Sequence, residues 1–442
     1  MPFKNRAALG WLPVLAFVAV AVFHGVVAWV GGSARNWHGQ TSEYYALLTD
    51  AFLAGQTSLL VQPSARLLAL PDPYDSAVNG RFRLHDASLY HGKYYLYFGP
   101  TPALVLFLPY RVLTGSHLPA RVAVALFCAG GLACSCALFF LLAKREKWDC
   151  PRWFASAAVV SLGTAPGVAF LVTRPSFYEV AISAGYCFIM AAFALITYSL
   201  EQDSPRTAPL IGAGLCFGLA AGCRPNFVLI AILMVVLVAW RTRSHKTRAL
   251  AFVAPVVLGG ILLAAYNYAR FQNPFDFGIQ YTLLDNRSDL NDHFGHSLGN
   301  LLPSLFVLVF SPVRLPPADL STGLLSGSPI ALIGLLTPCI LLYGRVRYHV
   351  KLGSTRFAIY CVYVSALSIL ILLALLGFTL RRYTVDFAPG FVLLSWCLLA
   401  AMWQAVQGLA EGKHTPFRIV VMAAALYPAL LDFSICVSRI PR

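Results

Sequence analysis

Long apolar runs dominate the pattern of hydrophobic and polar positions along the chain. A helix that crosses the hydrocarbon core of a bilayer needs about 20 predominantly apolar residues. Runs that meet or approach this length lie at residues 7–31, 119–142, 153–172, 180–200, 208–223, 226–240, 249–267, 328–344, 357–379, 388–407 and 417–437. The pattern therefore predicts an all-α fold, a polytopic transmembrane helical bundle of about 11 spans, in which residues 1–442 form a single domain.

Two further apolar stretches contain prolines and are too short to be full spans. They lie at residues 99–113 and 300–313, and each falls within a long loop, 32–118 or 268–327. We expect both stretches to be interfacial or re-entrant, because lipid cannot satisfy an irregular backbone. The first of these loops is thus predicted to carry interfacial helices on the outer face.

The composition agrees with a membrane protein. Hydrophobic residues make up 58% of the chain and charged residues only 12%, whereas soluble domains are about 25% charged. An ordinary cytosolic enzyme and a disordered chain are therefore excluded. Most of the 11 cysteines lie in apolar runs and none shows zinc-ribbon spacing, so we interpret them as small hydrophobic residues.

The net charge of +15 carries information about topology. On a soluble protein it would suggest nucleic acid, but in membrane proteins Lys and Arg collect in the cytoplasmic loops. With a cytoplasmic N-terminus, the inner segments hold 17 basic and 5 acidic residues, including KREKWDCPR and RTRSHKTR. We expect an integral membrane protein with its active site on the outer face and no nucleic-acid partner. The lack of a eukaryotic retention signal favours a bacterial plasma (inner) membrane, with the outer face periplasmic.

Acidic residues are scarce within the predicted spans and gather in the outer segments. Glu43 and Asp50 are seven residues apart, so a helix through 42–54 would place both carboxylates on one face. Asp86 follows in the same loop, and Glu179 lies in the outer turn TRPSFYEV. A cavity lined by such carboxylates would suit acid–base chemistry on a polar substrate. The alternative for each one is a solvated loop charge.

Basic residues repeat a pattern on the same face, where each lies beyond the outer end of a span or near residues 99–113. They are Lys93, Arg111, Arg174, Arg224, Arg270, Arg381 and Arg382. Arginine presents a planar fork that binds phosphate oxygens in pairs, so several arginines at one depth would hold a lipid-linked phosphate. The alternative is snorkelling to the headgroups, which fits less well where Arg381, Arg382 and Tyr383 share one tight turn with Asp386.

Aromatic residues are densest at 89–102, a stretch that includes Tyr94, Tyr95 and Tyr97. They could form a wall for a sugar ring or an isoprenoid chain, or an interfacial belt, where tyrosine is normally enriched. The stretch DNRSDLNDHFGH at 285–296 is rich in Asp and His but holds no Asp-x-Asp pair and no HExxH. We expect no cofactor, with a divalent metal there as the open alternative.

Four short stretches, taken in their order along the chain, resemble the GT-C class of integral-membrane glycosyltransferases, which includes lipid A aminoarabinose transferases and protein O-mannosyltransferases. The stretches are SEYYALLTDAFLAGQ, GKYYLYFGPTP, TRPSFYEV and RRYTVDFAP. The resemblance implies that Glu43 is the catalytic base and Glu179 the second acidic residue. It places Arg381, Arg382 and Tyr383 near the donor phosphate, and it matches Lys93 and, less closely, Arg174. From the residue pattern alone we add Asp50 as a catalytic candidate, Arg270 as a phosphate ligand, and Asp86, Tyr94, Tyr95 and Tyr97 as contacts to sugar or lipid.

The same resemblance implies a function. The donor would be a polyprenyl-phosphate-linked sugar, the acceptor a lipid, a glycan or a protein, and transfer would invert the anomeric centre with help from a carboxylate base. Membrane lipids would be further partners. An envelope-polysaccharide polymerase or ligase is the main alternative, because it also holds lipid-linked phosphate. A lipid-linked substrate transporter or flippase is the third, although charged residues deep in the spans, which it would need, are scarce.

Overall fold

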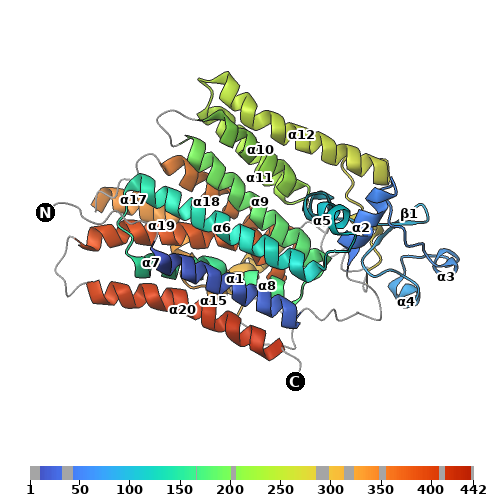
Figure 1. The fold of residues 1–442 in the computed structure, drawn as a ribbon, viewed down its shortest axis with the longest axis horizontal. Helices are drawn as coiled ribbons and strands as arrows, with labels where there is room; N and C mark the ends of the chain where they lie inside the picture. Colours follow the sequence, from blue (N-terminus) through green and yellow to red (C-terminus); the bar gives the residue numbers. More distant parts are fainter. Residues whose placement is uncertain are drawn as a thin grey trace.

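Long helices lie side by side in a bundle in the computed structural model (Figure 1). The structure describes residues 10–31, 43–165, 167–200, 206–284, 298–312, 323–347, 355–407 and 414–439. Within these ranges, seven helices are long and apolar enough to cross a membrane. They are α1 (Trp11–Gly31), α6 (Ala120–Glu146), α9 (Phe177–Leu200), α12 (Lys246–Phe271), α18 (Arg356–Leu375), α19 (Ala388–Gln407) and α20 (His414–Arg439). The predicted all-α, polytopic membrane fold is confirmed.

Two of the expected spans form helices shorter than the roughly 20 residues of a full span, and two are broken. Two become 15-residue helices, α10 (Thr207–Ala221) and α11 (Phe227–Arg241). The expected span 153–172 is divided into α7 (Arg152–Gly163) and α8 (Val168–Thr173), and 328–344 into α16 (Ala331–Leu335) and α17 (Thr337–Arg347).

Continuous helices were the wrong prediction for the two divided spans, and both breaks have a local cause. Gly167, the N-cap of α8, has a left-handed φ of +89°, which lies outside the range of φ in a right-handed helix, so a continuous helix cannot pass through it. Pro338 lies in the first turn of α17, where proline is tolerated because the amide it lacks would have no partner in any case.

Loops that the sequence assigns to opposite sides of the membrane lie at opposite ends of the bundle. At one end, called here the loop end, the Thr101 amide donates to the Gly222 carbonyl at 3.1 Å. At the other end, the Thr355 amide donates to the Glu146 carboxylate at 3.2 Å. Segments that are distant in sequence therefore meet in two separate layers, with the apolar helices between them.

The first long loop forms a compact unit at the loop end (Figure 1, right). Its elements are α2 (Tyr44–Leu53), α3 (Ala65–Leu68), α4 (Ser76–Asn79), β1 (Ser88–Tyr90), β2 (Lys93–Tyr95), the π-helical turn η2 (Ala103–Phe107) and α5 (Leu108–Thr114). The antiparallel hairpin β1–β2 was not part of the all-α prediction. Its two turn residues, His91 and Gly92, both have positive φ, as a tight hairpin turn requires.

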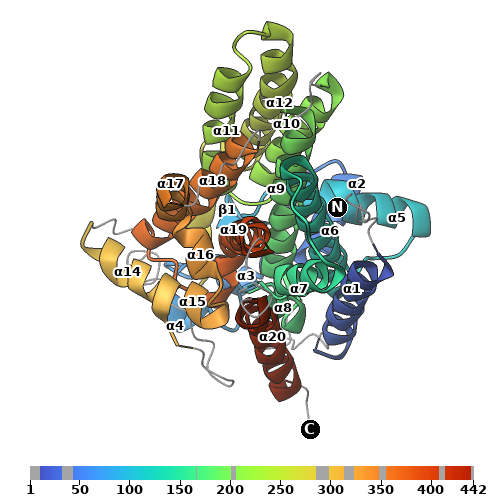
Figure 2. The same cartoon turned by 90° about the vertical axis from the view of Figure 1, so that its left-hand side faces the viewer.

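The two proline-containing stretches form short helices that run across the bundle axis. Figure 2, which looks along the bundle, shows α5 and α14 (Leu298–Phe310) lying flat at its periphery. In α5, Val112 and Leu113 expose 65% and 84% of their surface. This geometry is what an interfacial helix would have, since its apolar face is left for lipid. The same view shows α19 at the centre of the bundle, where Trp396 is fully buried.

Close backbone contact fastens the first loop onto the helices. A Cβ added at Gly99 would lie 2.1 Å from the Gly222 carbonyl oxygen, and one added at Gly222 would lie 2.3 Å from Thr101 Oγ1. Any side chain at these positions would push the loop away from the end of α10. The two glycines therefore set the distance between the loop and the bundle.

We expect Gly99→Ala to destabilise the protein, because the methyl group would meet backbone atoms that cannot move aside; overpacking of this kind costs about 1–3 kcal/mol. The measurement is the thermal unfolding midpoint of the detergent-solubilised protein. Gly260→Ala in α12 is the control, since a Cβ there meets nothing within 4 Å. Equal midpoints for the two variants would contradict the close contact.

Candidate active site

Glu179 and Arg382 meet at the loop end of the bundle. Glu179 lies in the first turn of α9, where Ser176 binds its Oε2 with both the amide, at 3.2 Å, and the hydroxyl. Its Oε1 lies 3.8 Å from Arg382 Nη1, and the Arg382 guanidinium lies 4.2 Å from the centre of the Tyr178 ring. The buried Arg382 Nε has no hydrogen-bond partner among the described residues, so the guanidinium keeps a donor for a ligand or water.

Asp386 and Arg224 form a buried ion pair beside this site. Both lie at the ends of elements, Asp386 in the short helix η4 (Arg381–Asp386) and Arg224 just after α10. Asn226 Nδ2 also donates to Asp386 Oδ2, at 2.8 Å. Burial raises the pKa of the Asp386 carboxyl above its ordinary value, against the opposing effects of Arg224 and Asn226. The opposite charges of Arg224 and Asp386 thus offset each other in an apolar setting.

Arg381 faces the last helix. Its Nη2 lies 4.0 Å from Asp432 Oδ1 of α20, and its guanidinium lies 5.5 Å from the centre of the Phe170 ring. Together, Arg224, Arg381 and Arg382 form what we call the arginine cluster, in which each arginine faces one carboxylate from a different part of the chain. Gly167 lets η4 pack closely here, since a Cβ on it would lie 2.6 Å from Thr384 Oγ1.

The first loop adds Tyr97 and Asp86 to the cluster. Burial raises the pKa of Tyr97 well above its ordinary value, the Asp86 carboxylate and Tyr383 raise it further, and Arg382 and Arg224 lower it. Tyr97 therefore lies within electrostatic range of Asp86, Tyr383, Arg382 and Arg224. Asp86 is buried and has a left-handed φ of +56°, a conformation that costs energy in a residue other than glycine.

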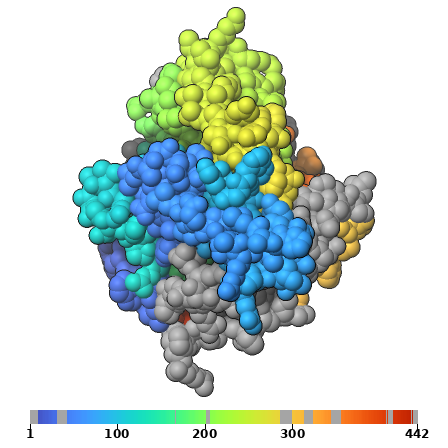
Figure 3. Space-filling model, turned by 90° about the vertical axis from the view of Figure 1, so that its right-hand side faces the viewer, coloured from blue at the N-terminus to red at the C-terminus, as the bar shows by residue number. Residues whose placement is uncertain are grey.

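The structure thus brings together five of the predicted site residues, namely Glu179, Arg382, Tyr383, Tyr97 and Asp86. Figure 3 looks onto the loop end, where the first loop, in blue to cyan, lies beside the yellow residues at the end of α12. The cluster lies at the base of this loop. The geometry offers fixed positive charge, carboxylates and a phenol hydroxyl in one partly dry site, which are the groups needed to bind a phosphate and move a proton.

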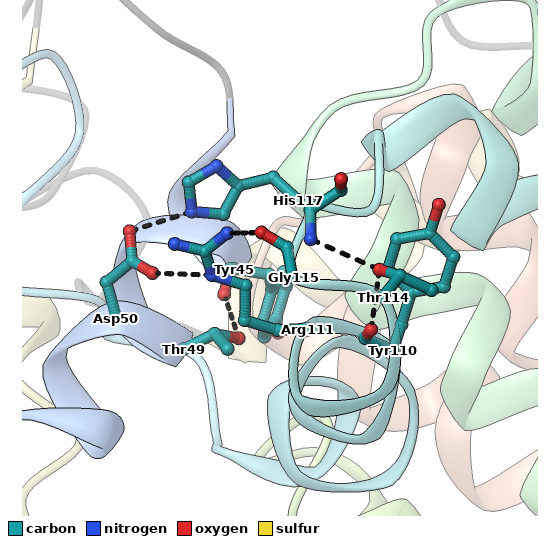
Figure 4. A network of polar contacts seen from close by, with 9 residues as sticks. Tyr45, Thr49, Asp50, Tyr110, Arg111, Thr114, Gly115 and His117 are labelled. Carbon is teal, nitrogen blue, oxygen red and sulfur yellow. Dashed lines mark hydrogen bonds and ion pairs between the residues drawn. The ribbon is translucent and has the colours of Figure 1, made fainter.

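Glu43 and Asp50 both face the start of α6. The Glu43 carboxylate accepts a hydrogen bond from the Ala120 amide at 2.9 Å, and Asp50 pairs with Arg111 and His117 (Figure 4). Burial raises the pKa of Glu43, while the Ala120 amide and then the nearby positive charges oppose the rise. The helix expected through 42–54 is α2, with Asp50 inside it and Glu43 at its N-cap.

The remaining predicted residues build the first loop or lie at its edge. Arg270 is buried, where it donates to the carbonyls of Leu96 and Phe98 and so ties the loop to α12. Two tyrosines are buried: the Tyr94 hydroxyl accepts from the Leu84 amide at 3.1 Å, and Tyr95 packs against Phe271. Lys93 is exposed on β2, and Arg174, which follows α8, is half-buried.

Sequence reasoning missed the partners that complete the arginine cluster. Arg224 and Asp386 were recognised as outer charges but not as one site, and Asn226 and Asp432 were not expected in it. The signal for Arg224 and Asn226 is their place in CRPN, immediately after an apolar run. Among the described residues no three His, Cys, Asp or Glu side chains form a group that could hold a metal ion. The stretch 285–296 lies outside the described residues.

Known structures share this fold. The chain aligns over 98% of its length with ArnT from Cupriavidus metallidurans bound to undecaprenyl phosphate, at 15% identity, a TM-score of 0.51 and 77% coverage of ArnT. It also aligns over 98% of its length with the Archaeoglobus fulgidus oligosaccharyltransferase tethered to an acceptor peptide, at 11% identity and a TM-score of 0.51, but spans only 56% of that protein. No protein-family model matches the chain, and no curated protein matches it.

Both of these proteins are GT-C glycosyltransferases. At such low identities the likeness shows a shared fold and leaves the activity open. The resemblance indicated by the sequence is thereby confirmed at the level of the fold.

Removing one member of the Arg224–Asp386 pair should cost about 3–5 kcal/mol, because a buried charge would lose its partner. We expect Arg224→Ala to lower the thermal midpoint in detergent far more than the exposed control Arg66→Ala. The double variant Arg224→Met, Asp386→Leu should recover most of the loss, since it removes both buried charges. An Arg224→Ala midpoint no lower than that of the control would show that the pair does not stabilise the fold.

Proposed function

We propose that this protein is a membrane glycosyltransferase that moves a sugar from a polyprenyl-phosphate donor to an acceptor at the loop end of the bundle. The observation that carries the proposal is the arginine cluster, in which Arg382 keeps an unpartnered buried donor beside Glu179, Tyr97 and Tyr383. The shared fold supports it, because ArnT, one of the structures with that fold, is bound to undecaprenyl phosphate.

Arg382 is the residue proposed to bind the donor phosphate first. Its distance of 3.8 Å to Glu179 is longer than a hydrogen bond, so a phosphate oxygen can compete for the guanidinium. Arg381 supplies a second fixed charge. The centre of the Tyr383 ring lies 5.0 Å from the guanidinium carbon of Arg224 and 5.4 Å from that of Arg382. Positive charge held in place in this way stabilises the leaving phosphate as charge develops on it.

Lys93, Arg174 and Arg270 belong to the outer part of the proposed phosphate site. Lys93 is exposed, so its side chain can follow a headgroup, whereas Arg174 is half-buried. Arg270 acts through the carbonyls it binds, which fix residues 96–98. Asp86, Tyr94, Tyr95 and Tyr97 are the proposed contacts to sugar or lipid, and of these Tyr97 and Asp86 face the arginine cluster.

Glu43 is the proposed general base, and Glu179 the second carboxylate of the site. In a single displacement with inversion, the acceptor hydroxyl oxygen bonds to the anomeric carbon and its proton passes to the base, while the bond from that carbon to the phosphate oxygen breaks and the phosphate departs. A carboxylate beside the reacting carbon also stabilises the oxocarbenium-like transition state. The acceptor is proposed to be a lipid, a glycan or a protein.

The loop end is proposed to face outward from a bacterial plasma membrane. The basic segments KREKWDCPR and RTRSHKTR flank the opposite ends of the helices, which supports a cytoplasmic side there. We propose no cofactor, since arginine charges supply the electrostatic role that a divalent ion would otherwise have. Incubation of the purified protein with polyprenyl-phosphate sugars tests the proposal: sugar transfer or hydrolysis supports it, whereas transport without bond cleavage in vesicles would favour a flippase.

Arg382→Ala should raise the KM for the donor by about tenfold or more, because a charge-assisted hydrogen bond contributes about 1.5–3 kcal/mol. The KM for the acceptor should stay nearly constant. Arg382→Lys should recover only part of the loss, since lysine keeps the charge but lacks the planar fork. Arg66→Ala, on the exposed first loop, is the control. Equal losses in the two KM values would argue against phosphate binding.

Glu43→Gln should slow transfer by about 10²–10⁴-fold, the usual contribution of a general base. In the unmodified protein, transfer should rise with pH through a pKa above the ordinary glutamate value, because burial raises the pKa of Glu43 and only the deprotonated form accepts a proton. A pH–rate profile of kcat/KM checks this, with Asp75→Asn as the control. Full activity of Glu43→Gln, together with loss of activity in Asp50→Asn, would make the base assignment wrong.

A further inference from the structure

Asp50 of α2 binds one residue of α5 and one residue of the connection between α5 and α6. Asp50 Oδ2 lies 2.8 Å from His117 Nε2, and Asp50 Oδ1 lies 3.4 Å from Arg111 Nε (Figure 4). Seven residues earlier, at the N-cap of α2, the Glu43 carboxylate accepts from the Ala120 amide at 2.9 and 3.3 Å. The two carboxylates of α2 therefore hold residues on both sides of Pro119.

Hydrogen bonds link the residues of the connection to one another and to α5, so a displacement of one residue also moves the others. Arg111 donates to the Gly115 carbonyl, and the Ser116 amide donates to Thr114 Oγ1 at 3.2 Å. Gly115 ends α5 with a φ of +71°. Asp50 thus binds a compact turn. One of its two partners, His117, lies three residues before Ala120.

The Glu43 carboxylate caps the N-terminus of α6. The first amides of a helix lack partners within the helix, and Pro119 at the N-cap provides no side-chain hydrogen bond. The Glu43 carboxylate fills this role from another segment, where the helix dipole also favours a negative charge. The position of Glu43 therefore depends on the position of the start of α6.

We propose that Asp50 is a positioning residue for Glu43: it fastens the α5–α6 turn to α2 and thereby keeps the Ala120 amide on the Glu43 carboxylate. This inference rests on the proposed function, in which Glu43 is the base. In this proposal Glu43 touches the reacting groups, whereas Asp50 acts on Glu43 through His117 and Arg111.

The charged groups around the two carboxylates indicate how the effect would be seen. Arg121 and His117 face Glu43, and Arg111 and His117 face Asp50. The Ala120 amide, Arg121 and His117 all lower the pKa of Glu43 against the effect of burial. If the turn is released, these contacts weaken, and the base should require a higher pH to be deprotonated.

The test compares Asp50→Asn, His117→Asn and Asp50→Glu in the full-length protein in detergent. We expect faster amide hydrogen exchange across residues 115–121 in the first two variants, and a pH–rate profile displaced to higher pH, with about tenfold slower transfer at the acidic limb for a displacement of one pKa unit. The donor KM should hold while kcat falls. Asp50→Glu should restore both readouts in part, and Asp75→Asn, in the same loop, should change neither.

Two outcomes would overturn the inference. Asp50→Asn could abolish transfer at every pH with unchanged hydrogen exchange, which would place Asp50 itself on the substrate. It could also leave both exchange and the pH profile unchanged, which would show that the clamp does not position Glu43. Full activity in Glu43→Gln is a different result: it would refute the base assignment, while the exchange data would still report on the clamp.

Discussion

A charged side chain inside an apolar bundle must have a partner, and this constraint organises the loop end of the protein. Taking a charge out of water costs several kcal/mol, which only close opposite charge and hydrogen bonds offset. Three ion pairs satisfy this constraint, namely Arg224–Asp386, Arg381–Asp432 and Arg382–Glu179. Each pair joins two elements that are distant in sequence, so the pairing fixes α9, α10, η4 and α20 relative to one another as well as stabilising the charges.

The break between α7 and α8 lies beside the arginine cluster, because Phe170 of α8 faces the Arg381 guanidinium and Gly167 lies close to Thr384. Gly167 begins α8 and at the same time lets η4 pack closely against it. Gly99 and Gly222 bring the first loop into backbone contact with the end of α10. A loop held by backbone contacts is a better support for Tyr97 and Asp86 than a loop held by side chains alone.

The sequence predicts the bundle and its two-sided charge distribution because apolar length and basic loops are properties of single segments. It also places Glu43 and Asp50 on one helix face, since their spacing is local. It does not predict that Asp432 faces Arg381, because that contact depends on how α20 packs. Nor does it predict the breaks at Gly167 and Pro338, because a glycine or proline near the middle of an apolar run can also lie within a continuous membrane helix. The hairpin at 88–95 was missed because tyrosine is equally common at a membrane interface.

The charge balance of the arginine cluster limits how a phosphate could bind there. Three arginines face three carboxylates, so the cluster has little net charge to attract an anion over a distance. In the proposed reaction, the affinity must come instead from exchange, in which a phosphate oxygen replaces Glu179 on Arg382. The pair is suited to this, because its atoms lie 3.8 Å apart and Ser176 already provides the Glu179 carboxylate with two other donors. The released carboxylate would then remain hydrogen-bonded beside the sugar, where a negative charge stabilises the oxocarbenium-like transition state. Arg224 and Asp386, which are in direct contact and more deeply buried, would keep their pairing throughout and hold Tyr383 in place.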